Sequence, residues 1–384
     1  MKRINSIDFT RGLVMVIMAI DHCRDLLHIG INPTDLTVTT PFLFFTRWIT
    51  HLCAPTFVFL SGTSAYLSYK NQNASLKESQ RFMLSRGIWL IILEFTIIGF
   101  ALWFDFKFRM FFFQVIGAIG LGFIILSFLM KLTPKTILII GLAIIFGHNL
   151  LGLLPFNETP YSYFAPLFSF SLFQVTPNTT FAIGYPPIPW LGIMLAGYGM
   201  GGLVFNKTQS DRKATLLKLG LGSLALFAII RFINIYGDPV PWSPQKDAVF
   251  TFMSFMNLTK YPPSLLYTLA TLGISFIILS VSDGAKNKFI DIMTVYGKVP
   301  LFYYLIHWYL IHSIMFVMLY MQGFQYKDFV FGPFQFGRPQ QPSGLELGGV
   351  YLVWLAVVIS LYPLCKWYSN YKAAHKDIKW LRYL

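Results

Sequence analysis

Long apolar stretches recur along the chain and constrain its fold more than any other feature. About ten runs of roughly 20 predominantly apolar residues alternate with segments rich in Gly, Pro, Asn and Lys. An α-helix of that length crosses the hydrocarbon core of a bilayer, where the backbone has to satisfy its own hydrogen bonds. The sequence therefore predicts an all-α, polytopic integral membrane protein, a single domain over residues 1–384 with about ten transmembrane helices. Their approximate limits are 9–29, 44–69, 87–104, 110–130, 135–154, 188–206, 214–235, 262–282, 298–321 and 347–367.

Charged residues are too scarce for a soluble domain of this length. They make up 12% of the 384 residues, against about 25% in soluble proteins, while 55% are hydrophobic and the mean hydropathy is +0.59. The formal net charge of +14 comes from short basic clusters with no continuous basic face, so no nucleic-acid partner is expected. The three cysteines occur singly, which predicts neither disulfides nor a metal site.

The loops that carry Lys and Arg alternate along the chain, and this pattern predicts the orientation of the helices. Lys2 and Arg3 belong to the basic set, as do clusters within 70–86, 131–135, 207–218, 286–298 and 366–382. By the positive-inside rule both termini are cytoplasmic. Three long connections fall on the opposite side, at about 155–187, 236–261 and 322–346, and they are rich in aromatic residues and proline. They are expected either to fold as an outer cap around an opening or to rest on lipid headgroups.

The first predicted span carries ionisable residues that a bilayer disfavours. Arg11 and His22 are 11 residues apart, which places them on one face of a helix about 16 Å apart along its axis. Asp8 and Asp25 fall near the same stripe, and Asp21 lies beside it. An interfacial ion pair at the helix entry explains Asp8 and Arg11, but a histidine beside a carboxylate deep in a span is typical of a general base. His22 with Asp21 is therefore the first candidate for a functional site.

Two further spans add polar candidates. Arg47, His51 and Pro55 are four residues apart on one face of the second span, and Pro55 leaves a backbone carbonyl free to line a cavity. Glu94 in the third span either pairs with a buried cation such as Arg231 or belongs to the site. Sequence motifs of soluble catalysis, such as a Walker loop or a GxSxG elbow, are absent.

The ninth predicted span begins GKVPLFYYLIHWYLIH and contains another buried histidine. Lys298 marks its cytoplasmic entry, and His307 lies about 13 Å further in, at a depth comparable to the middle of the first span. A histidine among Tyr303, Tyr304 and Trp308 is either hydrogen-bonded within the core or part of the functional site.

The spacing of Arg11 and His22 resembles the R-x10-H signature of the transmembrane acyltransferase superfamily. Further blocks, spread from the first to the ninth span, are similar to the bacterial relatives of heparan-α-glucosaminide N-acetyltransferase. These blocks are SIDFTRGLVMVIMAIDHCRD, PTFVFLSGTSAYL, YPPIPWLGIMLAGYGMGG, KYPPSLLYTLATLG and GKVPLFYYLIHWYLIH. The resemblance implies a membrane-embedded acetyltransferase that uses cytoplasmic acetyl-CoA and acetylates a sugar amine or hydroxyl on the other side of the membrane.

The resemblance also implies roles for individual residues. Carried over by position, His22 is the general base, and Asp21 or Asp25 orients its imidazole. In the heparan-type branch the catalytic histidine lies beyond this position, toward the following loop. His28 and His51 are therefore alternatives for the base.

The donor site implied by the resemblance lies near the cytoplasmic mouth. Arg11 steers the phosphates or pantetheine of acetyl-CoA there, and Lys298 and His307 are assigned to the same site. The chain is expected in a bacterial inner membrane, surrounded by membrane lipids and modifying an envelope glycan or another periplasmic acceptor, and a homodimer is left open. The rival interpretation is a proton-coupled transporter or permease that uses the same Asp–His track.

Overall fold

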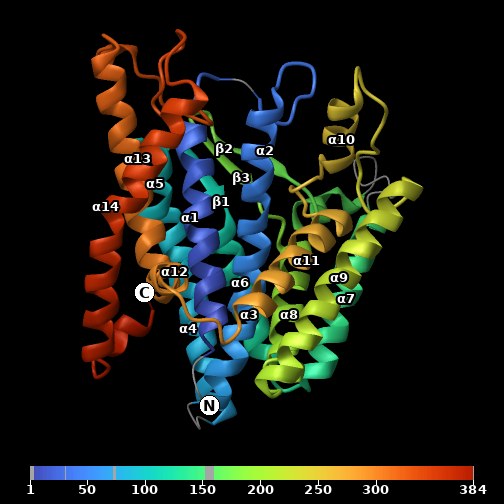
Figure 1. Ribbon diagram of the computed structural model, residues 1–384. Helices are drawn as coiled ribbons and strands as arrows, with labels where there is room; N and C mark the ends of the chain where they lie inside the picture. The colour runs from blue at the N-terminus through green and yellow to red at the C-terminus, as the bar shows by residue number, and fades with distance from the viewer. Residues whose placement is uncertain (1–3, 31, 72–74, 152–159, 384) are drawn as a thin grey trace.

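The structure is a bundle of long α-helices, several of them tilted against one another (Figure 1). This computed structural model describes residues 4–30, 32–71, 75–151 and 160–383. Parts of three predictions lie outside these residues: Lys2 and Arg3, the end of the predicted span 135–154, and the start of the predicted connection 155–187. The predicted helical, polytopic fold is confirmed.

Each of the ten predicted spans has a helical counterpart. Seven of these segments are long and apolar enough to cross a membrane. The other three are α6 and α8, with 15 and 17 residues, and α1, which carries the polar track. In chain order the segments are α1 (Asn5–Leu27), α2 (Pro41–Ile49) continued by α3 (Cys53–Asn71), α4 (Leu76–Leu93) continued by α5 (Gly99–Trp103), α6 (Val115–Leu129), α7 (Pro134–Leu151), α8 (Pro187–Leu203), α9 (Gln209–Ile233), α11 (Leu265–Ser282), α13 (Pro300–Met321) and α14 (Leu347–Ala374).

The long connections gather at one end of the bundle, toward the top of Figure 1. The second of them contains a short helix, α10 (Ala248–Met256). The first residues of α1 and the last turn of α14 lie at the opposite end (Figure 1). We call the end with the long connections the outer end and the opposite one the inner end. Which end faces the cytoplasm remains a prediction from the basic residues.

A three-stranded sheet at the outer end was not predicted. Strand β1 (Met110–Phe113) pairs in parallel with β3 (Thr179–Ile183), which also pairs antiparallel with β2 (Ser171–Thr176). The predicted span 110–130 was therefore wrong at its start, because residues 110–113 form a strand and α6 begins only at residue 115. A run of aromatic residues fits a strand as well as a helix, so hydropathy alone could not place this boundary.

Glu94 holds the start of α6, and of the two alternatives predicted for it the pairing with Arg231 is wrong. The Glu94 carboxylate accepts hydrogen bonds from the backbone N–H groups of Gln114 and Gly117, at 3.0 and 2.9 Å. A carboxylate suits this position because the first N–H groups of a helix have no partner within the helix. The Arg231 guanidinium instead donates to four backbone carbonyls in and around α10.

The helix α12 (Lys288–Lys298) was also missed, because its 11 residues mix charged and apolar side chains. It packs against α1, and the two helices cross where Gly12 faces Gly297. The predicted span 298–321 agrees with α13, which begins at Pro300, and Lys298 is the last residue of α12. The crossing brings the inner part of α1 close to Lys298.

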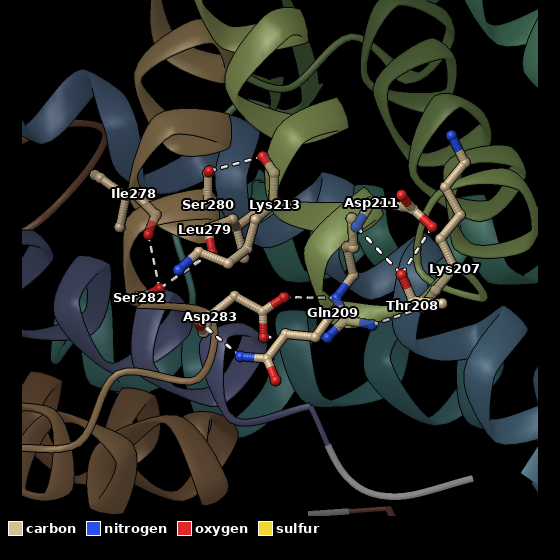
Figure 2. Close-up of polar contacts among 11 residues, drawn as sticks. Lys207, Thr208, Gln209, Asp211, Lys213, Ile278, Leu279, Ser280, Ser282 and Asp283 are labelled. Atoms are coloured by element: carbon tan, nitrogen blue, oxygen red, sulfur yellow. Dashed lines mark hydrogen bonds and ion pairs between the residues drawn. The ribbon is translucent and has the colours of Figure 1, made fainter.

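Polar contacts fasten α9 to the end of α11 at the inner end (Figure 2). The Arg212 guanidinium donates to the Asp283 carboxylate at 2.7 and 3.1 Å, and Gln209 Nε2 donates to the Asp283 carbonyl at 3.2 Å. Ser280 Oγ donates to the Lys213 carbonyl at 2.8 Å. Arg212 is therefore a buried, paired side chain of α9 and not a solvated loop residue.

Candidate active site

Arg11 lies where three helices meet at the inner end of α1. Its Nη2 donates to Ser64 Oγ on α3 at 2.7 Å, and its Nη1 donates to the Gly297 carbonyl on α12 at 3.2 Å. The Asp8 carboxylate lies 3.4 Å from Nη1, which confirms the predicted pair at the helix entry. These contacts hold the guanidinium beside the residues that line the inner cavity described below.

His22 meets a second histidine, which comes from α13. His22 Nδ1 lies 2.6 Å from His307 Nε2, and the other ring nitrogen of His307 lies 3.0 Å from the Tyr303 carbonyl. The Trp308 ring stacks on the His22 ring with centroids 4.0 Å apart, and Tyr304 approaches it edge-on at 6.3 Å. His307 is completely buried, whereas His22 is partly exposed.

The carboxylates next to His22 are paired with arginines. The Asp21 carboxylate lies 2.9 Å from Arg24 Nη2 and 3.5 Å from Arg47 Nη1. Arg24 Nη2 also contacts the Asp25 carboxylate at 2.5 Å. The partner of His22 Nδ1 is therefore a histidine of α13, in place of the Asp21 or Asp25 that the resemblance implied.

A cavity of about 280 Å³ opens at the inner end of the bundle. Its apolar wall includes Met15, Met18 and Phe57, and Tyr304 also belongs to its lining. Basic side chains from four parts of the chain surround it: Arg11, Arg86, Lys298, Lys372 and Arg382. The predicted neighbours Arg11 and Lys298 thus line one cavity, which combines apolar walls with positive charge.

A second cavity, of about 520 Å³, lies at the outer end. Most of its lining residues are of polar or charged type, with charged groups from α1, α2 and the segment before α11. The residues are Arg24, Asp25, Asn32, Pro33, Thr34, Arg47, His51, Val240, Asn257, Leu258, Thr259, Lys260 and Tyr261. The mixture of amide, hydroxyl and charged side chains suits a polar ligand better than an apolar one.

His51 belongs to this outer cavity. It is buried in the 3₁₀ turn between α2 and α3, and its ring packs edge-on against Tyr267 at 5.2 Å. Its backbone carbonyl accepts a hydrogen bond from the Tyr267 hydroxyl at 2.9 Å. Pro55, four residues later, cannot donate to that carbonyl. The carbonyl that the sequence predicted to be free of helical bonding is therefore bound by a tyrosine of α11.

His28 lies at the end of α1 and is not among the residues that line either cavity. Its backbone pairs with Leu345 in an isolated parallel bridge, and its carbonyl accepts a hydrogen bond from Arg338 Nη1 at 2.8 Å. These contacts attach the end of α1 to the third long connection.

His22 lies between the two cavities along α1. Met18, one turn before it, lines the inner cavity, and Arg24, two residues after it, lines the outer one. Tyr304 belongs to the inner cavity and touches the His22 ring. His22 itself is in the lining of neither cavity, and Tyr304 is the lining residue that contacts its ring.

Sequence reasoning missed several basic residues of the two cavities. It used three residues of the inner cavity, Arg86, Lys372 and Arg382, only as markers of membrane orientation. Lys260 of the outer cavity was quoted within a proline-rich block and given no role. These residues come from separate helices and connections, so no local sequence pattern groups them.

The fold and site define the class as a polytopic membrane protein with a histidine pair on α1 and α13, between a basic inner cavity and an outer cavity lined by many polar and charged residues. Comparison with protein families supplies the activity. The model of the family described as "Heparan-alpha-glucosaminide N-acetyltransferase, catalytic" matches residues 3–231, more than half of the chain. The chain belongs to this family, which confirms the resemblance seen in the sequence and indicates a membrane acetyltransferase. A search among curated proteins finds no match.

Proposed function

We propose that the protein transfers an acetyl group from cytoplasmic acetyl-CoA, bound in the inner cavity, to a glycan amine or hydroxyl that enters through the outer cavity. The observation that carries this proposal is the position of His22 between two cavities that lie toward opposite ends of the bundle. A transfer across a membrane needs two substrates to meet at one catalytic group without a continuous pore.

The inner cavity has the chemistry that CoA requires. CoA carries a 3′-phosphate and a pyrophosphate, and the cavity is surrounded by five basic side chains, Arg11, Arg86, Lys298, Lys372 and Arg382. The apolar wall beyond them suits the pantetheine arm. Arg11 and His22 are about 16 Å apart along α1, so the arm would run along this helix with its thioester toward Tyr304 and His22.

The chemical step needs one base and close approach of the acceptor. His22 takes the proton from the acceptor nitrogen or oxygen while that atom forms a bond to the acetyl carbon. The carbon–sulfur bond of the thioester then breaks, and the thiolate of CoA leaves with the electron pair and receives the proton from His22. Because the thioester is already activated, alignment and proton transfer supply most of the catalysis.

The basic residues at the inner end support a place in the bacterial inner membrane, with the outer cavity facing the periplasm. The acceptor would then be an envelope glycan or a related periplasmic compound. The amide, hydroxyl and charged side chains of the outer cavity offer the hydrogen-bonding partners that a sugar needs.

Donor binding separates the proposal from the rival proton-coupled transporter. CoA at about 100 times its dissociation constant should stabilise the purified protein by about 2.7 kcal/mol, measured as a higher unfolding temperature. Arg11→Ala should weaken CoA binding by roughly 10- to 100-fold, because a hydrogen bond to a charged group contributes about 1.5–3 kcal/mol. Lys288→Ala, an exposed residue of α12 outside the cavity lining, is the matched control. Absence of any CoA effect on the wild type would favour the transporter.

Acetyl transfer from radiolabelled acetyl-CoA to glucosamine or to an envelope-glycan extract tests the base. His22→Ala should abolish transfer at equal expression in membranes, while His375→Ala, at the end of α14, should leave it unchanged. His51→Ala and His28→Ala decide between the alternatives, since His51 lines the outer cavity and His28 lines neither. Full transfer by His22→Ala would remove His22 from the mechanism.

A further inference from the structure

We propose that His307 is a positioning residue that fixes the tautomer of His22, so that His22 Nε2 is the atom that takes the acceptor proton. The inference rests on the proposed function, because it concerns the base of that reaction. It assigns to α13, which lies beyond the matched family segment, a defined part in the chemistry.

The proton on His307 is placed by a backbone carbonyl. His307 Nδ1 lies 3.0 Å from the Tyr303 carbonyl oxygen, which can only accept a hydrogen bond. Nδ1 of His307 must therefore carry the hydrogen. In a neutral imidazole the other nitrogen, Nε2, then holds a lone pair and can only accept.

The proton on His22 follows from the proton on His307. His22 Nδ1 is 2.6 Å from His307 Nε2, a distance at which two lone pairs would repel each other. Nδ1 of His22 must therefore be the donor. With its single hydrogen on Nδ1, neutral His22 has its lone pair on Nε2, and this nitrogen is free to remove a proton from the acceptor.

The surroundings keep the His22 ring in this orientation. Trp308 stacks on one face with an interplanar angle of 24°, and Tyr304 meets the ring edge-on at 80°. His307 is itself held by Tyr303, whose ring stacks on it at 10° with centroids 5.2 Å apart. A flip of the His22 ring would break the bond to His307 and disturb the stack on Trp308.

The same contact would stabilise His22 during the reaction. When His22 gains a proton at Nε2, the ring becomes a cation and its Nδ1–H bond to His307 becomes charge-assisted, which makes it stronger than a neutral hydrogen bond. In many catalytic sites a carboxylate has this role. Here the adjacent carboxylate, Asp21, is paired with Arg24 and Arg47, and a neutral histidine accepts instead.

A matched pair of substitutions at one position tests the inference. His307→Gln can place an amide oxygen near the position of Nε2 and accept from His22, whereas the shorter side chain of His307→Asn reaches only the position of Nδ1. We expect His307→Asn and the apolar His307→Leu to lower kcat by at least about 100-fold, and His307→Gln to recover at least about tenfold of that loss. The KM for acetyl-CoA should change little in all three.

The outcomes separate this inference from the proposed function. If the wild type transfers acetyl groups but His307→Gln is no more active than His307→Asn at equal folding, the tautomer role is wrong and the proposed function stands. If the wild type neither binds CoA nor transfers acetyl groups, the proposed function fails. Nitrogen NMR of ¹⁵N-histidine-labelled protein reports the tautomer directly, and a hydrogen on Nε2 of neutral His22 would overturn the inference in either case.

Discussion

The crossing of α1 and α12 leads to a prediction that can be worked out from distances. A Cβ atom added at Gly12 would lie 1.8 Å from the Met293 carbonyl oxygen and 2.9 Å from the Gly297 nitrogen. Both are backbone atoms, so no change of side-chain rotamer relieves the overlap. To reach an ordinary contact of 3.4 Å, the two helices would have to separate by about 1.6 Å.

The expected size of the effect follows from two opposing contributions. Overpacking in a close-packed interior costs about 1–3 kcal/mol, and a clash with backbone belongs at the upper end of that range. Replacing glycine by alanine within a helix favours folding by about 0.5–1 kcal/mol. Gly12→Ala should therefore destabilise the protein by about 2 kcal/mol.

Unfolding of the purified protein in detergent, followed by intrinsic fluorescence, measures this change. Gly222→Ala in α9 is the matched control, because a Cβ atom there meets no atom within 4 Å. The control should be as stable as the wild type or about 0.5–1 kcal/mol more stable. A Gly12→Ala protein as stable as the Gly222→Ala control would refute the close approach of α1 and α12 and the position it gives to Arg11.

Three further predictions concern stability. Arg212→Met leaves the Asp283 carboxylate buried without its partner and should lower the free energy of unfolding by about 3–5 kcal/mol. Replacing Asp283 by Leu in the same protein should recover much of that loss, and thermal unfolding of both variants tests the pair. Glu94→Ala leaves two N–H groups at the start of α6 unsatisfied and should cost about 1–3 kcal/mol, whereas Glu94→Gln, which can still accept, should cost less. Partial burial raises the pKa of Asp105, but hydrogen bonds from Arg109 and the backbone outweigh it and hold that pKa below its ordinary value. Its contribution to stability is therefore present at neutral pH and is lost as the pH falls through the folded-state pKa. Asp105→Asn should lower the unfolding temperature at pH 7, by an amount that shrinks as the pH is lowered below the ordinary pKa of an aspartate, about 3.9.

Local sequence was sufficient where a property depends on neighbouring residues alone. The runs of apolar residues located every long helical segment, because a backbone in hydrocarbon can satisfy its hydrogen bonds within one helix. The 11-residue spacing placed Arg11 and His22 along α1, with Asp8 beside Arg11. The same information could not locate the strand Met110–Phe113, because its partners lie about 70 residues later.

The sequence by itself determined the class of the fold and the presence of an ionisable stripe on its first helix. Only the tertiary structure decided what that stripe contacts. His22 lies against His307 and not Asp21, and Arg11 donates to Ser64 and to the Gly297 carbonyl. Residues nearer each end of α1 line a cavity. The physical reason is the separation along the sequence over which each property is set. Helix formation and hydropathy are read within about 20 consecutive residues, whereas hydrogen-bond partners and cavities depend on the packing of helices far apart in the chain.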